Sequence, residues 1–153
     1  MIFLRTEPLL KFWRLPSDER RLLVLAGATL IAARLGLWML PFKAARRLVL
    51  GASKLVGGTA TMPPARVARA IARTSRFVPR ASCLVQAVAA ESMLKVMGCP
   101  VTLRIGVAKP DNGSLEAHAW IESRGSVVVG GDGFERYWTL SPSSVTESLG
   151  RRP

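Results

Sequence analysis

The chain has 153 residues, 49% of them hydrophobic and 21% charged, a composition that fits a packed domain of ordinary size and excludes gross disorder. Its formal net charge is +12, and all of this excess lies in residues 1–80, because residues 81–153 carry basic and acidic side chains in equal number. The asymmetry predicts two regions with different roles, and the basic region suits an anionic partner such as nucleic acid, a membrane surface or an acidic peptide.

The first long apolar run, residues 22–40, has about the length of a membrane span. Arg34 interrupts it, and an arginine in the middle of a span costs about 2.5–3.5 kcal/mol. The run also begins too late, and after too many charges, for a secretory signal peptide. Two interpretations stay open: a buried or interfacial helix, and a helix embedded in the membrane.

Helical periodicity predicts three helices in the basic region, at about 18–40, 43–55 and 65–76. Pro41 ends the first of them. Arginines three and four residues apart form one basic stripe on the third: Arg66, Arg69, Arg73 and Arg76. No aromatic residues are interleaved with this stripe, so nucleic acid is not expected as a partner.

The pattern changes after Pro79. Ser82 is a good N-cap for a helix over 83–97, and Gly98 provides its C-terminal signal. Alternating apolar and polar residues then predict strands at 101–107, 116–122 and 126–129, joined by turns. The order predicts an α+β fold, with residues 1–80 as an N-terminal helical region and residues 81–153 as the core that carries the chemistry.

Two cysteines, Cys83 and Cys99, flank the predicted helix and lie roughly 24 Å apart at 1.5 Å per residue. A disulfide needs Cα atoms within about 7 Å, so both are expected to be free thiols, which fits a protein of the reducing cytoplasm. Cys83 lies in the first helical turn, where the helix dipole favours the nucleophilic thiolate. The alternative is a small buried hydrophobic residue, which is the role expected of Cys99.

His118 is the only histidine and therefore the only imidazole that could act as base for a cysteine nucleophile. Strand alternation places it on one face with Trp120, and the alanines on either side leave room for another element. Asp132, which follows the third strand, is the candidate to orient the imidazole. Asp111 and Glu116 are second choices, because one lies in a turn and the other beside the histidine on the same strand.

The backbone N–H of Cys83 is the expected oxyanion donor, and Gln86, one turn later, is a candidate for lining the site. No metal or cofactor is expected. Two cysteines and one histidine lack the paired spacing of a zinc site, and the glycine pairs at 57–58 and 130–131 lack the lysine of a phosphate-binding loop.

Three segments, 82–87 (SCLVQA), 103–107 (LRIGV) and 115–122 (LEAHAWIE), together resemble the leader peptidases of lasso peptide biosynthesis. That family has a transglutaminase-like, papain-related cysteine protease fold, and the resemblance covers about residues 12–140. The HAW motif is general to transglutaminase-like proteins, whereas its combination with the preceding strand is more specific. The resemblance implies that Cys83 is the nucleophile, His118 the base and Asp132 the orienting acid.

The resemblance also implies a substrate and partners. A hydrolase of this kind removes the leader from a ribosomally made precursor peptide, before a separate asparagine synthetase-like lasso cyclase closes an isopeptide ring. Some relatives carry a winged-helix module that binds the leader, and residues 1–80 do not have that character. We therefore expect the stand-alone form, which needs a separate leader-binding protein (a RiPP recognition element) and uses its basic half to dock this partner or the precursor.

Two alternatives stay open from sequence. One is acyl transfer to an amine in place of water, as in transglutaminases. The other is a membrane- or partner-binding module whose triad is inactive, in which Cys83 could be replaced without loss of function.

Overall fold

The computed structural model describes residues 13–56, 62–109 and 113–140. These residues form the following elements: α2 (Ser17–Met39), α3 (Phe42–Val56), α4 (Pro64–Ser75), α5 (Cys83–Val96), β1 (Thr102–Ala108), β2 (Glu116–Ser123), β3 (Ser126–Val129), the 3-10 turn η1 (Phe134–Arg136) and β4 (Trp138–Thr139). This is the predicted α+β fold, and the boundaries of the predicted helices and strands agree with it to within one residue. The two shortest elements, η1 and β4, were not predicted, because two or three residues are too few to show a period.

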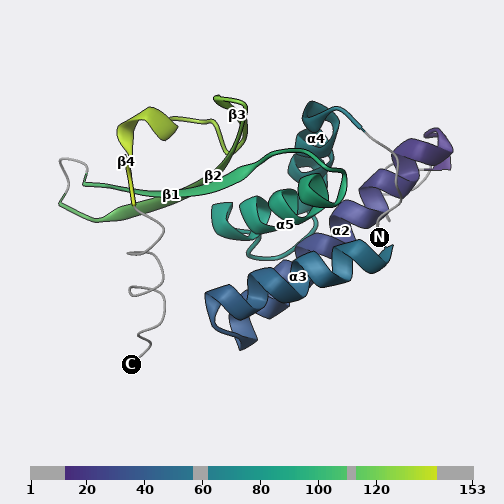
Figure 1. The fold of residues 1–153 in the computed structure, drawn as a ribbon, viewed down its shortest axis with the longest axis horizontal. Helices are drawn as coiled ribbons and strands as arrows, with labels where there is room; N and C mark the ends of the chain where they lie inside the picture. The colour runs from purple at the N-terminus through teal and green to yellow at the C-terminus, as the bar shows by residue number, and fades with distance from the viewer. Residues whose placement is uncertain (1–12, 57–61, 110–112, 141–153) are drawn as a thin grey trace, which may run out of the picture.

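Helix α5 lies between two layers of the fold (Figure 1). It packs against α2, α3 and α4 on one side and against the sheet, mainly β2, on the other. Its buried side chains therefore run almost without a break along the helix: Val85, Ala87, Val88, Ala89, Ala90, Glu91, Ser92, Met93 and Leu94. A helix that is buried all round needs apolar residues on every face, which explains why no polar stripe marks it in the sequence.

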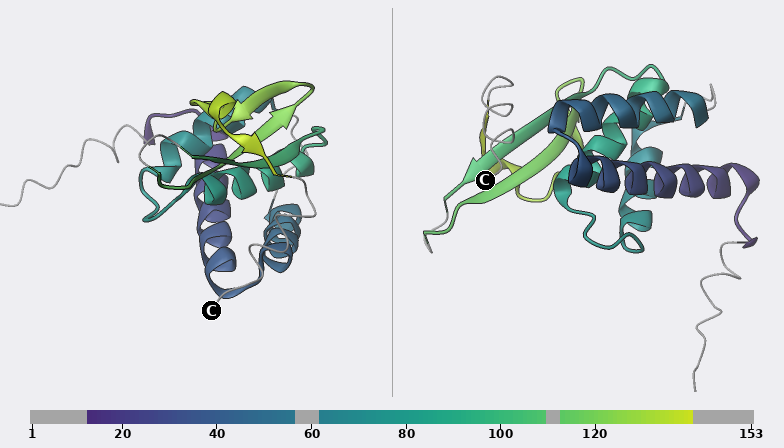
Figure 2. Two further views of the ribbon diagram at one scale, coloured as in Figure 1. Left: turned by 90° about the vertical axis from the view of Figure 1, so that its left-hand side faces the viewer. Right: turned by 90° about the horizontal axis from the view of Figure 1, so that it is seen from below.

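One hydrophobic cluster combines residues from both sides of position 80. It includes Leu30 of α2 and Ile71 of α4 together with Leu94 of α5 and Ile121 of β2. Figure 2 shows α2 and α3 side by side, and both contact α5. The predicted N-terminal helical region thus packs directly against the segment that carries the candidate nucleophile.

The sheet has the order β3-β2-β1-β4, and neighbouring strands are antiparallel. Ala119 and Ile121 of β2 belong to the cluster around α5. Alternation along the strand therefore places His118 and Trp120 on the opposite face, as the sequence predicts. The η1 segment covers that face (Figure 1). The ring of Phe134 in this segment lies 5.9 Å from that of Trp120.

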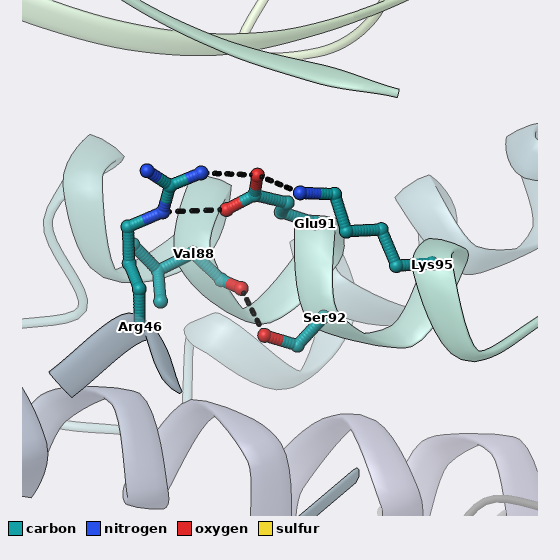
Figure 3. A network of polar contacts seen from close by, with 5 residues as sticks. All are labelled: Arg46, Val88, Glu91, Ser92 and Lys95. Atoms are coloured by element: carbon teal, nitrogen blue, oxygen red, sulfur yellow. Dashed lines mark hydrogen bonds and ion pairs between the residues drawn. The ribbon is translucent and has the colours of Figure 1, made fainter. Parts of the chain in front are cut away.

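A buried carboxylate joins α3 to α5 (Figure 3). Glu91 has a side chain only 5% exposed, and its Oε2 accepts a hydrogen bond from Arg46 Nε at 2.9 Å. Its Oε1 accepts from a second Arg46 nitrogen and from Lys95 Nζ, the latter at 2.8 Å. Two cations thus neutralise the one buried carboxylate of α5, which is the condition under which a charge is stable in a core.

A second set of ion pairs joins α4 to α2. Arg66 and Arg73 of the predicted basic stripe lie 3.5 and 3.3 Å from carboxylate oxygens of Glu19. Half of that stripe therefore binds the neighbouring helix.

Helix α2 is long and apolar enough to cross a membrane by length and composition alone, with a mean hydropathy of 1.9. One third of its apolar window is buried inside the protein. The buried residues, including Ala26, Leu30 and Ala33, recur at helical spacing and face the other helices.

Candidate active site

Cys83 is the first residue of α5, as predicted. The Ser82 hydroxyl caps the helix by accepting a hydrogen bond from the Val85 backbone N–H at 3.4 Å. Gln86 points its side-chain amide backward, and Nε2 donates to the Ala81 carbonyl at 2.9 Å, so this side chain ties the helix start to the preceding turn. Cys83 and Cys99 are both free and half-buried. The Cys83 thiol therefore has partial solvent access at a capped helix N-terminus, a position that favours an anion.

The imidazole of His118 has a defined orientation. Its Nε2 lies 2.8 Å from the Gly130 carbonyl oxygen. A carbonyl oxygen can only accept, so Nε2 carries the proton and Nδ1 is the unprotonated nitrogen of the neutral ring. Two aromatic rings hold the plane of the imidazole, with centroids at 6.1 Å for Trp120 and 5.1 Å for Tyr137. The ring is therefore prepared to take a proton on Nδ1.

Gly130 provides this acceptor because it lacks a side chain. Its φ of +76° is unfavourable for other residues, and a Cβ at this position would lie 2.8 Å from the carbonyl oxygen of Ala119. Only glycine lets the end of β3 approach β2 closely enough to bring its carbonyl to His118. From sequence, the glycine pair at 130–131 was considered as a phosphate-binding loop, which it does not match, and this role was missed.

Gly106 is the second glycine that shapes the site. It pairs with His118 across β1 and β2. A Cβ at Gly106 would lie 2.8 Å from Tyr137 Cβ and 2.9 Å from Trp120 Cη2, so its absence makes room for the aromatic side chains around the imidazole. The signal was present in the sequence, because a glycine inside a strand often marks the close approach of another group.

Among the described residues, no hydrogen bond or ion pair joins the imidazole to Asp132 or Glu116. Asp132 is exposed in the turn after β3, and Asp111 lies outside the described residues. Glu116 accepts a hydrogen bond from Tyr137 Oη at 3.3 Å and reaches the imidazole only through that ring. Within the part of the chain that the structure describes, the Gly130 carbonyl is the hydrogen-bond partner of His118, and the orienting role of Asp132 stays a prediction.

The candidate nucleophile and base lie on elements that pack together, α5 and β2. No hydrogen bond joins Cys83 to His118 among residues 13–56, 62–109 and 113–140, and the imidazole lies on the face of β2 turned away from the core cluster. Their pairing therefore stays a prediction. The arrangement provides a thiol at a helix N-terminus and, on the neighbouring sheet, an imidazole whose Nδ1 is free to accept a proton.

Trp120 anchors the strand beside the histidine. Its side chain is 2% exposed, and its indole Nε1 donates to Glu122 Oε1 at 2.9 Å. Arg104 of β1 binds the other oxygen of Glu122 at 3.0 Å. The indole hydrogen bond, with the Arg104 guanidinium in support, holds the pKa of Glu122 below its usual range. These hydrogen bonds join β1 to β2 next to His118.

The described residues contain no group of three or more His, Cys, Asp or Glu side chains placed to hold a metal ion. Comparison with known proteins adds one finding: residues 22–141 match the transglutaminase-like superfamily. No curated protein and no solved structure matches the chain. The match begins inside α2 and ends beyond β4, so it includes Cys83, His118 and the helices packed around them.

Proposed function

Because the chain belongs to the transglutaminase-like superfamily, we propose that it is a cysteine peptidase that removes the leader from a ribosomally made lasso precursor peptide. The superfamily fold is one used by cysteine peptidases and acyltransferases, and its members are usually catalytic. The observation that carries the proposal is the place of Cys83 as the first residue of the capped helix α5. The resemblance of segments 82–87, 103–107 and 115–122 to lasso leader peptidases supports the substrate class.

The proposed reaction passes through an acyl-enzyme. Nδ1 of His118 takes the Cys83 thiol proton, and the thiolate adds to the carbonyl carbon of the leader–core bond, where the backbone N–H of Cys83 at the start of α5 stabilises the oxyanion. Collapse of this intermediate breaks the C–N bond, and His118 gives its proton to the departing amine of the core peptide. Water then attacks the thioester while His118 takes its proton, which releases the leader acid and restores the thiolate.

This reaction requires the imidazole to approach Cys83 when substrate binds. The imidazole lies on the face of β2 turned away from the cluster against which Cys83 packs, so binding has to bring the two side chains together, a larger change than the tightening of a long hydrogen bond. The Nε2–H bond to the Gly130 carbonyl supports the proposal, because it leaves Nδ1 as the base. Asp132, two residues further along the same turn, is proposed to stabilise the imidazolium that forms.

The proposed partners follow from the same assignment. A separate leader-binding protein would deliver the precursor, and a lasso cyclase would take the released core peptide. Arg69 of α4 and Arg76 at its C-terminal end, which are exposed, offer a cationic surface for an acidic partner, and both processing steps belong in the cytoplasm.

Mass spectrometry of a precursor incubated with the protein and a leader-binding protein tests this function. We expect one cleavage at the leader–core bond, complete loss of cleavage with Cys83→Ala, and retention of most activity with the matched control Cys99→Ala. Equal loss from both changes would contradict a nucleophile at Cys83. A new amide formed with an added amine would identify an acyltransferase instead.

The Asp132 assignment has its own test. Asp132→Ala should lower kcat at least about tenfold with little change in KM, because the carboxylate acts on the imidazolium and does not bind the peptide. A kcat within about twofold of the parent would show that the Gly130 carbonyl alone orients His118.

A further inference from the structure

Helix α2 carries an exposed stripe that contains no polar residue. Val24, Ile31 and Leu35 are 58%, 52% and 49% exposed, and every other exposed position from residue 24 to the end of the helix is also apolar. These positions recur three and four residues apart, so they lie on one face and extend over roughly 20 Å at 1.5 Å per residue. The solvent face of a core helix is normally polar. This face therefore has the composition of a contact surface.

Helix α3 continues that surface and adds charge to it. Leu48 and Leu55 are 54% and 89% exposed and lie seven residues apart on one face of the helix. Arg47 and Lys54, also exposed and seven residues apart, form an adjacent row about 100° around the helix. Long basic side chains beside an apolar row are typical of helices that lie in a membrane interface, where the cation reaches the headgroups and the stem covers apolar surface.

A hollow between the two helices enlarges the apolar area. It has a volume of about 230 Å³ and is lined mainly by apolar side chains of α2, α3 and α5. Ala28, on the exposed stripe of α2, and Ala52 of α3 both contribute to its wall. The hollow is therefore lined on one side by the exposed stripe of α2 and on another by α3.

The charge around this surface selects an anionic occupant. Among the described residues of α2, α3 and α4 the carboxylates are those of Asp18 and Glu19, and Glu19 is already paired with two arginines of α4. We infer that the α2–α3 face, defined by Val24, Ile31, Leu35, Leu48 and Leu55 with its basic border, docks on the surface of an anionic lipid bilayer.

The packing of α2 also decides its orientation at the bilayer. Ala26, Leu30 and Ala33 are fully buried against the other helices. A helix that crossed the bilayer would have to give up these contacts and place Arg34 within the hydrocarbon. The helix therefore lies in the plane of the interface with its exposed stripe toward the lipid, which is a monotopic association.

Vesicle co-sedimentation tests this inference directly. The probes are phosphatidylcholine vesicles with about 30% phosphatidylglycerol and vesicles of phosphatidylcholine alone, at about 0.1 M salt. We expect binding to the anionic vesicles that is at least about tenfold tighter than to the neutral ones. Ile31→Gln/Leu35→Gln should weaken binding at least about tenfold, and Arg47→Ser/Lys54→Ser should weaken binding to anionic vesicles by about tenfold.

Matched controls lie beside the strands of the sheet, which pack on α5 opposite α2 and α3. Leu115→Gln removes a side chain that is 72% exposed near the start of β2, and Lys109→Ser/Arg124→Asn removes two exposed cations from the sheet. Both control proteins should bind like the parent, and circular dichroism should show every variant folded with an unchanged melting temperature. Cys83→Ala should also bind like the parent, so the result is independent of the proposed peptidase activity.

Three outcomes would overturn the inference. The first is no co-sedimentation of the folded parent protein with anionic vesicles. The second is binding that Ile31→Gln/Leu35→Gln leaves unchanged, since the apolar stripe would then not contact lipid. The third is a dimer in light scattering that the same double change converts to monomer, because a second copy of the chain would then cover this face.

Discussion

Replacing Arg46 with Met would break the ion pair that joins α3 to α5 while keeping most of the aliphatic stem of the side chain. The change leaves Glu91, with a side chain 5% exposed, with Lys95 as its remaining cation. Breaking a fully buried pair costs about 3–5 kcal/mol. Arg46 is itself 35% exposed and Lys95 stays in place, so we expect a loss of about 2–3 kcal/mol.

Urea unfolding followed by circular dichroism at 222 nm measures this loss as a lower midpoint at constant slope. For a chain of this length, the same loss should lower the melting temperature by roughly 4–12 °C. Arg47→Met is the matched control, because Arg47 is the next residue on α3 and is exposed; its effect should stay within about 0.5 kcal/mol.

A double change completes the test. Arg46→Met/Glu91→Met replaces the pair by apolar side chains of similar volume and should be more stable than Arg46→Met alone, because no unpaired charge stays in the core. The reasoning would be refuted by an Arg46→Met protein as stable as Arg47→Met. A double variant whose loss of stability equals the sum of the losses measured for Arg46→Met and for Glu91→Met alone would also refute it.

Three further predictions concern the sheet and the glycines. Because the pKa of Glu122 is lowered in the folded protein, its carboxylate contributes to the free energy of unfolding at neutral pH. This contribution is lost as the pH falls below the ordinary pKa of 4.5. The stability difference between the parent and Glu122→Gln should therefore shrink toward zero in acid unfolding titrations. Gly106→Ala should destabilise by about 1–3 kcal/mol in urea unfolding and alter the near-ultraviolet circular dichroism of the aromatic side chains, because the new methyl group would meet Tyr137 Cβ at 2.8 Å. Gly51→Ala, on α3 with no atom within 4 Å of the added Cβ, should instead stabilise by about 0.5–1 kcal/mol, and a loss there would contradict the assignment of open space.

The sequence predicts most of the fold because its local signals agree with the packing. Ser82 caps a helix, Gly98 follows its end, and apolar residues alternate in β1 and β2, so pattern and tertiary structure require the same elements. The buried pair of Arg46 and Glu91 was not predicted, because a charge 45 positions away gives no local signal. Contacts of this kind depend on the arrangement of helices in space, which periodicity does not contain.

The candidate site was predicted only in part for a similar reason. Cys83 and His118 could be chosen because helix starts favour thiolates and the chain has one imidazole. The acceptor for His118 Nε2 was expected to be a side chain, whereas the structure provides the backbone carbonyl of Gly130. Every residue has a carbonyl, so sequence can indicate such an acceptor only through the glycine that lets the backbone come close.

The burial of α5 has a consequence for how the protein opens. Amides in a helix enclosed on both sides exchange with solvent mainly through global unfolding, whereas the first turn of any helix can fray at low cost. The candidate nucleophile lies at that first turn, two residues before Val85, the first buried residue of the helix. Hydrogen exchange should therefore be slowest from Ala87 to Leu94 and faster around Cys83, so the thiol can adjust to a bound peptide while the rest of its helix stays closed.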